Sequence, residues 1–225
     1  MINYFWYFII YNIIYCLQDY LDVYQIFIII PGLITLGFCI FEYLDHFSVK
    51  PKKTTISSLD MMPQILFNNV FGSICFALLL YLCNRGYELC IISQAQIAID
   101  MLKLYFIFDL CFYVFHRSIH HPLLYFIHKK HHSTFADNAI STHYMSFMDF
   151  MLEVILPFWI ATIIVNPSLT STMCFLVIGQ VNGLVTHSGY KLLGFPSPEN
   201  HQDHHVSFNR RYGVGGPWDY IFGTN

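Results

Sequence analysis

Charged residues are scarce in this chain of 225 residues: Asp, Glu, Lys and Arg make up 11% of it, against about 25% in typical soluble domains. The formal net charge is only −3, so the sequence gives no support for a nucleic-acid partner. The first apolar stretch has neither a basic start nor a small-residue cleavage site, and we expect no cleaved signal peptide. Hydrophobic residues account for 56%, which indicates a membrane protein.

Cysteine provides no framework for the fold. The seven cysteines form no CxxC pair, and their spacing indicates no set of disulfides. All of them lie within or beside apolar runs, so we expect thiols that pack as small hydrophobic side chains. The chain is long enough for one sizeable domain.

Six apolar runs are candidates to cross a bilayer, which takes about 20 residues in a helix. They lie at residues 3–18, 23–41, 64–83, 95–115, 147–165 and 169–186. The short Asn-Pro-Ser sequence between the last two predicts a helical hairpin. The sequence therefore predicts an all-α fold, a polytopic membrane helical bundle with about four to six membrane segments.

Lysine and arginine concentrate after the second span, after the fourth span and in the C-terminal segment. These residues are Lys50, Lys52, Lys53, Arg117, Lys129, Lys130, Lys191, Arg210 and Arg211. Because cytosolic loops of membrane proteins carry an excess of Lys and Arg, we expect these segments to face the cytosol. The histidine-rich segments of the chain lie in the same connections and share that prediction.

Asp100, Asp109 and Glu153 are acidic residues inside apolar runs. A charge at the centre of a bilayer costs about 2.5–3.5 kcal/mol on insertion scales, so each needs a partner or a polar cavity. Asp100 and Lys103 are one helical turn apart, and we expect them to pair.

Histidines form three clusters with helical spacing. An HxxxH cluster and two HxxHH clusters comprise His116 and His120; His128, His131 and His132; and His201, His204 and His205. Each spacing allows the rings of a cluster to share one helix face and point to one centre. Eight imidazoles exceed the ligands of one tetrahedral ion, so we predict two metal ions. His143 and His187 lie near the predicted hairpin, whereas His46 and His121 are not expected to be ligands; a solvated polar face is the alternative for the clusters.

Asp109, Tyr113, His116 and His120 step along the chain by four, three and four residues, which places them in one stripe on a helix. A carboxylate below a ligand can accept the outer N–H of a histidine and fix its tautomer. We therefore predict supporting roles for Asp109 and Tyr113, with no side chain acting as a nucleophile. Pairing of Asp109 with a basic group elsewhere is the alternative.

The segments FDLCFYVFHRSIHHPLLYFIHKKHH, THSGY and HQDHHVSFNRRYGVGGPWDYIFGT resemble the fatty acid hydroxylase superfamily of membrane di-iron proteins. This group contains C4-methylsterol oxidases, sterol C5-desaturases and cholesterol 25-hydroxylase. The HSGY sequence and the closing segment look most like the C4-methylsterol oxidase and cholesterol 25-hydroxylase branch. By this resemblance, residues 95–225 are the catalytic region and residues 1–94 are N-terminal membrane segments of a single integrated domain.

The resemblance implies a set of metal ligands: His116, His120, His128, His131, His132, His143, His187, His201, His204 and His205. It implies two iron ions, with zinc able to replace them in purified protein, and molecular oxygen as oxidant. Electrons would come from cytochrome b5 or an NAD(P)H-dependent reductase. The expected location is the endoplasmic reticulum or an equivalent internal membrane, with the metal site facing the cytosol.

The predicted function is hydroxylation of a sterol or fatty-acyl substrate by a membrane di-iron monooxygenase. A desaturase of the same superfamily is the alternative, because the same oxidant can remove a second hydrogen. The family's His-Pro-x-Glu motif stands here as HYMSFMD, without its Pro and Glu, so a catalytically decayed lipid-binding homologue is a further alternative. A further hypothesis, from a different functional class, is a non-enzymatic protein such as a zinc transporter or a bis-histidine cytochrome.

Overall fold

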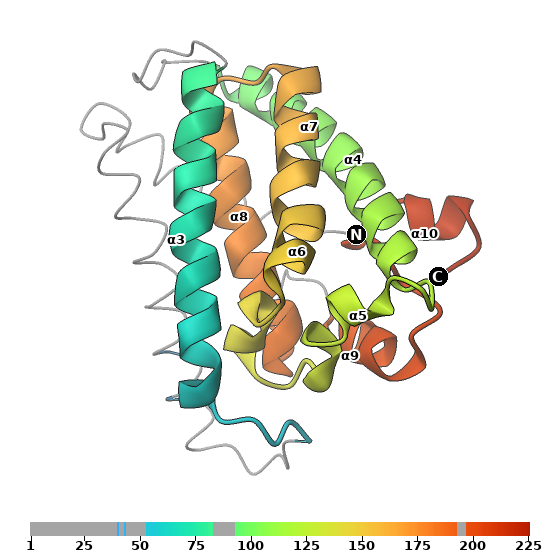
Figure 1. The fold of residues 1–225 in the computed structure, drawn as a ribbon. Helices are drawn as coiled ribbons and strands as arrows, with labels where there is room; N and C mark the ends of the chain where they lie inside the picture. Colours follow the sequence, from blue (N-terminus) through green and yellow to red (C-terminus); the bar gives the residue numbers. More distant parts are fainter. Residues whose placement is uncertain (1–39, 41–42, 44–52, 83–92, 193–196) are drawn as a thin grey trace.

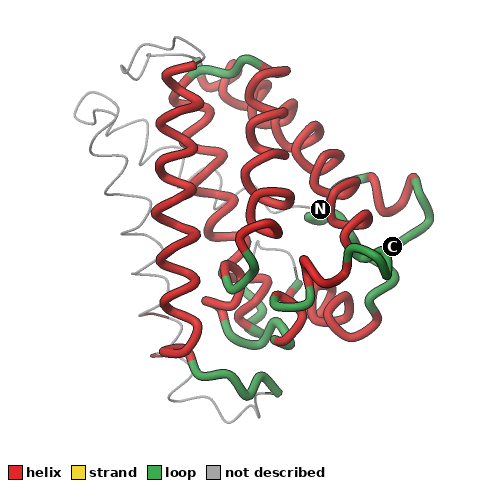
Figure 2. Tube along the Cα trace, in the orientation of Figure 1, coloured by secondary structure: helices red, strands yellow, loops and turns green. Residues whose placement is uncertain are grey.

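The computed structural model describes residues 53–82, 93–192 and 197–225, together with the single positions 40 and 43. Within these ranges the chain is helical and contains no strand (Figures 1 and 2). The all-α prediction is therefore confirmed. The predicted spans at 3–18 and 23–41 lie outside the described residues, except for position 40.

Four long helical elements stand side by side in Figure 1. They are α3 (Ser58–Leu82), α4 (Gln94–Ile119), α8 (Leu169–Ser188), and a continuous rod made of α6 (Phe147–Phe150), a π-helical turn (Met151–Ile155) and α7 (Leu156–Val165). Three stretches among the described residues are long and apolar enough to cross a membrane: Ser58–Leu79, Phe147–Val165 and Leu169–Ser188. These agree with the spans predicted at 64–83, 147–165 and 169–186. The span predicted at 95–115 forms the helix α4, which is not one of the three.

The turn between α7 and α8 is built from the Asn-Pro-Ser sequence. Asn166 ends α7 in the left-handed conformation with φ of 50°, which asparagine tolerates better than most residues. Ser168 begins α8 by accepting the Ser171 backbone N–H on its hydroxyl at 3.0 Å. The predicted hairpin is confirmed.

Asp100 fastens this turn to α4. Its carboxylate accepts hydrogen bonds from the Ser171 hydroxyl at 2.8 Å, the Ser168 backbone N–H at 3.3 Å and the Gln96 amide at 2.8 Å. The predicted Asp100–Lys103 pair is wrong, because packing of α4 against the hairpin supplies closer donors than the next helical turn does. Sequence spacing on one helix cannot show donors that come from another.

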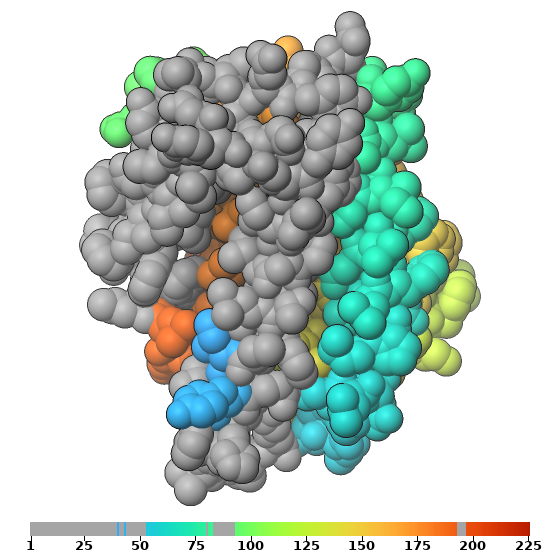
Figure 3. Space-filling model, turned by 90° about the vertical axis from the view of Figure 1, so that its left-hand side faces the viewer, coloured from blue at the N-terminus to red at the C-terminus, as the bar shows by residue number. Residues whose placement is uncertain are grey.

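The hydrophobic core joins the long helices. One cluster contains Phe76, Leu79, Phe158, Leu169 and Met173, from α3, α7 and α8. Of the described cysteines, Cys75 and Cys174 are buried free thiols, as expected from their apolar surroundings. Large apolar side chains are instead exposed along α3, including Phe67 and Val70, as suits a helix that faces lipid. Figure 3 shows α3 on the surface of the molecule.

Short segments collect at one end of the helical rods (Figure 1). They are α5 (Tyr125–His128), a 3₁₀ turn (His131–Ser133), a second 3₁₀ turn (Ala139–His143) and α9 (Pro198–Ser207), with α10 (Trp218–Ile221) beside α4. All the histidine clusters lie in these segments or at the adjoining end of α4. The fold thus gathers distant parts of the sequence at one place.

Candidate metal centre

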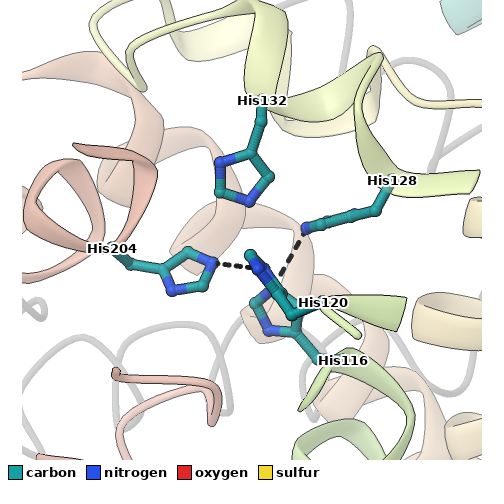
Figure 4. A group of neighbouring side chains, drawn as sticks. All are labelled: His116, His120, His128, His132 and His204. Atoms are coloured by element: carbon teal, nitrogen blue, oxygen red, sulfur yellow. Dashed lines mark hydrogen bonds between the residues drawn. The ribbon is translucent and has the colours of Figure 1, made fainter. Parts of the chain in front are cut away.

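Histidines from four parts of the chain converge in two adjoining groups. The first group contains His116, His120, His128, His132 and His204. The second group contains His131, His187, His201 and His205. Within each group, one ring nitrogen per residue lies within 4.8 Å of those of the other members. Figure 4 shows the first group, with rings from α4, α5, the first 3₁₀ turn and α9 turned toward a common centre.

Each HxxHH cluster divides between the two groups. His128 and His132 join the first group while His131 joins the second; His201 and His205 join the second while His204 joins the first. In a helix, residues i and i+4 differ by about 40° around the axis, whereas neighbours differ by about 100°. The expectation that each HxxHH cluster points to a single centre is therefore wrong: the i, i+4 pairs stay together and the third ring crosses over. This division holds the two groups side by side.

Backbone carbonyls define which ring nitrogen carries the proton. Four histidines donate from Nδ1 to a carbonyl oxygen: His116 to Tyr212 at 2.7 Å, His187 to Gly183 at 2.9 Å, His204 to Arg210 at 2.7 Å and His205 to Thr134 at 2.9 Å. A carbonyl oxygen can only accept, so the proton must be on Nδ1. In these neutral rings the Nε2 atom then presents a lone pair to the centre of its group.

The inward ring nitrogens of each group are close enough together to bind one metal ion. Nε2 of His116 lies 3.1 Å from Nε2 of His128, and Nε2 of His120 lies 3.2 Å from Nε2 of His204. In the second group, Nε2 of His201 lies 2.9 Å from Nε2 of His187. His116 and His128 both carry their proton on Nδ1, so their facing lone pairs repel one another unless a cation lies between them. Neutral imidazole is a preferred ligand of iron, zinc and copper, so the donor set matches two transition-metal ions.

Asp149 fixes the orientation of His128. Both carboxylate oxygens lie 2.9 Å from the His128 Nδ1, and neither side chain is exposed to solvent. The carboxylate accepts the Nδ1 proton and leaves Nε2 free for the first group, as carboxylates commonly do beside metal-bound histidines. The sequence did not reveal this role, because the HYMSFMD segment lacks the Pro and Glu of the family motif. An acid inside an apolar run was the available signal.

Asp109 acts through the C-terminal loop. Its Oδ1 accepts the Val214 backbone N–H at 2.7 Å, and no hydrogen bond to a histidine is found among the described residues. The prediction that Asp109 accepts a histidine N–H is therefore wrong, and within the described part of the chain Asp109 has no basic partner either. Asp219 accepts the neighbouring Tyr212 N–H at 2.9 Å. The two acids hold the loop whose Tyr212 carbonyl orients His116.

Tyr113 lies on the same side of α4 as Asp109. Its hydroxyl accepts from Arg117 at 2.7 Å and from the Thr224 hydroxyl at 3.2 Å, and its ring stacks on Phe222 at 5.1 Å. These contacts tie the end of the chain to α4. Tyr113 thus stabilises the C-terminal loop, and its hydroxyl makes no hydrogen bond to a histidine of either group.

Comparison with known proteins agrees with this site. The sequence profile of the fatty acid hydroxylase family matches residues 101–224, which is more than half of the chain and includes both histidine groups. The chain belongs to the fatty acid hydroxylase family. The resemblance in the three quoted segments is confirmed.

Curated relatives carry names from the same family. Fatty acid hydroxylase domain-containing protein 2 of Homo sapiens is 34% identical over 118 residues, 52% of this chain and 35% of the relative. Fatty acid hydroxylase ahd1 of Mycosarcoma maydis is 28% identical over 193 residues, 82% and 50% of the two chains. Delta(7)-sterol 5(6)-desaturase of Leptosphaeria maculans is 30% identical over 121 residues, 52% and 34%. The chain thus matches half or less of each relative's length, and no solved structure matches it.

His143, which the resemblance to the family assigned as a ligand, lies outside both groups. It is buried, and burial is the main reason that its pKa falls to about 4. Its backbone carbonyl accepts from the Asn68 amide at 3.1 Å. The structure therefore brings together nine of the ten predicted ligands and gives His143 a different place.

His121 is exposed and belongs to neither group, as expected, and His46 lies outside the described residues.

Burial keeps the ligands neutral. The pKa of His120 is lowered to about 3 and that of His204 to about 4, in both cases chiefly because burial disfavours the charged ring. Burial and the neighbouring histidines also hold the pKa of His116, His128 and His131 well below 6.5. At neutral pH every one of these rings offers a lone pair without first losing a proton.

Metal-free protein should lose stability as the pH falls from about 7 to about 5. A histidine titrates near 6.5 in the unfolded chain but only near 4 at His204 in the folded protein, so the unfolded state takes up the proton first. His204 alone should account for a loss on the order of 2 kcal/mol over this range. Thermal unfolding of the metal-free protein in detergent measures it. A His204→Gln variant should lose less, and an unchanged unfolding temperature in the wild type would contradict the expectation.

Proposed function

We propose that this chain is a membrane lipid monooxygenase that holds two iron ions and uses molecular oxygen to hydroxylate a sterol or fatty-acyl substrate. One observation carries the proposal: nine buried or half-buried imidazoles form two adjoining groups whose ring nitrogens lie close enough together to bind a metal ion in each. When bound, an iron pair supplies the reduction of oxygen that cleavage of an unactivated C–H bond requires. Neutral imidazole is a suitable ligand for iron.

The chain's own residues hold the ligands and exclude water. The side chains of His128 and His204 are completely buried, and His116 is 2% exposed. Asp149 and the carbonyls of Tyr212 and Arg210 keep the first group's Nε2 atoms directed inward. Because these ligands are held before a metal arrives, little reorganisation is needed on binding.

The position of the site supports a lipid substrate. The metal groups lie where α4 and α8 end, beside helices long and apolar enough to cross a membrane. An alkyl chain or sterol ring could approach from the bilayer without crossing water. Relatives named as a fatty acid hydroxylase and as a sterol desaturase support both substrate classes.

The proposed setting is an internal membrane such as the endoplasmic reticulum, with the site on the cytosolic face. Lys129, Lys130, Arg210 and Arg211 lie beside the ligands in sequence, which agrees with the excess of basic residues in cytosolic segments. The electron donor would be cytochrome b5 or an NAD(P)H-dependent reductase on the same face. Desaturation is the second candidate, supported by the two relatives named Delta(7)-sterol 5(6)-desaturase.

Labelled oxygen separates these outcomes. Lipids of cells that express the protein should be compared with lipids of cells expressing His131→Ala, both grown under ¹⁸O₂. We expect a hydroxylated lipid that carries one ¹⁸O atom and is absent with His131→Ala; a new double bond without label would establish the desaturase instead. Purified protein that contains two irons, accepts electrons and yields neither product would contradict the proposal, as would a Soret band in its visible spectrum.

A further inference from the structure

Glu153 is a buried carboxylate beside the first histidine group. Its residue is 2% exposed, and its Oε1 lies 3.4 Å from Nε2 of His116 and 3.6 Å from Nδ1 of His128. This oxygen has no hydrogen-bond partner, and no lysine or arginine pairs with it among the described residues. An isolated carboxylate in such surroundings is costly, so the group either keeps its proton or lies beside a positive charge.

The neighbouring histidines do not stabilise this oxygen with a hydrogen bond. His116 donates its Nδ1 proton to the Tyr212 carbonyl, so the Nε2 that faces Glu153 carries a lone pair. The Nδ1–H of His128 donates a hydrogen bond to Asp149 at 2.9 Å, a shorter distance than the 3.6 Å from Nδ1 to Glu153 Oε1. The Glu153 oxygen therefore faces the lone pair of His116 Nε2 and receives no hydrogen bond from either histidine.

A local irregularity of the helix places Glu153 there. Residues Met151–Ile155 form a π-helical turn, in which the Leu156 N–H donates to the Met151 carbonyl five residues earlier. Pro157 follows, and because proline has no N–H the Glu153 carbonyl cannot receive its usual α-helical bond. Single π-turns are frequent at functional sites because they re-aim side chains. Here the turn lies between Asp149, which holds His128, and the hydrophobic part of α7.

We propose that Glu153 is a carboxylate ligand of the ion held by the first histidine group, an inference that rests on the two-metal centre of the proposed function. Glu153 would then add one charged oxygen beside His116, its nearest ring of the first group; the oxygen does not lie within 4.8 Å of all five rings, so binding requires a small movement of the side chain. The second group has only imidazoles among the described residues. The two ions are thus inequivalent, and the negative charge stabilises the higher oxidation state of the first.

The test compares Glu153→Gln with wild type in the full chain, purified in detergent and loaded anaerobically with Fe(II). Glutamine keeps the shape but removes the charge. We expect iron to leave the first group at least about tenfold faster under a chelator, and the second iron to leave at the wild-type rate. Mössbauer spectra of the wild type should show two distinct iron environments, of which the variant alters one. Asp60→Asn, at an exposed carboxylate of α3, is the matched control and should change neither.

Unfolding temperatures separate a ligand from a packing residue. Without metal, Glu153→Gln should be as stable as wild type or more stable, because a buried charge has been removed; with metal it should be less stable. A loss of equal size in both states would overturn the ligand role. If Glu153→Gln does not fold, Glu153→Asp, which withdraws the carboxylate by one methylene, should fold and release iron faster than wild type. If the wild type binds two irons and Glu153→Gln shows unchanged iron release and an unchanged spectrum, the ligand role of Glu153 is refuted and the proposed function is not. If the wild type binds no iron, the proposed function itself is refuted.

Discussion

Replacing His204 with Ala should leave the protein with about one bound metal ion in place of two, and replacing its neighbour His205 should do the same for the other ion. The two residues are adjacent on α9, yet His204 belongs to the first group and His205 to the second. Each substitution removes one imidazole nitrogen from its group, so the ion of that group is bound by fewer ligands. Product formation should fall by at least about a hundredfold in both variants, because the proposed reaction needs both ions to act on oxygen.

Metal analysis of the purified variants measures the first effect and the lipid assay the second. Mössbauer spectra should show that the two variants lose different iron environments. His121→Ala is the matched control, since His121 is exposed and lies one residue from the ligand His120. His143→Ala should also retain both ions, because His143 lies outside both groups. Full metal content in both His204→Ala and His205→Ala would show that the two groups are not the binding sites.

Gly216→Ala should destabilise the protein by on the order of 3 kcal/mol and weaken metal binding about tenfold or more. A Cβ atom at Gly216 would overlap the carboxylate of Asp109, which is completely buried and bonded to Val214. The loop must move to relieve this overlap. Its displacement would shift Tyr212, whose carbonyl lies 2.7 Å from Nδ1 of His116. A substitution away from the histidines thus reaches the first group through one carbonyl.

Unfolding temperature and iron release under a chelator measure this effect. Gly179→Ala provides the control, because Gly179 lies in α8 and a Cβ there meets nothing within 4 Å. That change should be neutral or stabilising by up to about 1 kcal/mol, the usual preference for alanine over glycine in a helix. Equal stability of Gly216→Ala and wild type would show that the loop does not depend on close contact with Asp109.

The order of the histidines along the chain was sufficient to predict a metal centre. Helical spacing of the three clusters indicates grouped ligands, and three segments resemble the fatty acid hydroxylase family, to which the chain belongs. The predicted hairpin at residues 166–168 follows from local turn chemistry and is confirmed. These features are encoded within short stretches, so reading the sequence reveals them.

The partners of the buried acids depended on contacts between distant segments. Asp100 binds the hairpin rather than Lys103, Asp109 binds the C-terminal loop rather than a histidine, and Asp149 binds His128 from another helix. A hydrogen bond of this kind joins residues that the sequence separates by many positions, and its donor is chosen by packing. Spacing alone can say that an intramembrane acid needs a partner but not which one.

What the sequence by itself determined is the chemical inventory: apolar helices, ten candidate histidine ligands and a family membership that names their chemistry. Only the tertiary structure decided how each HxxHH cluster divides between two centres, which ligand candidate stands apart, and that Glu153 reaches the first centre. The physical reason is directional. Periodicity fixes the angle at which a side chain leaves its own helix, but what it meets there is set by the packing of all the others.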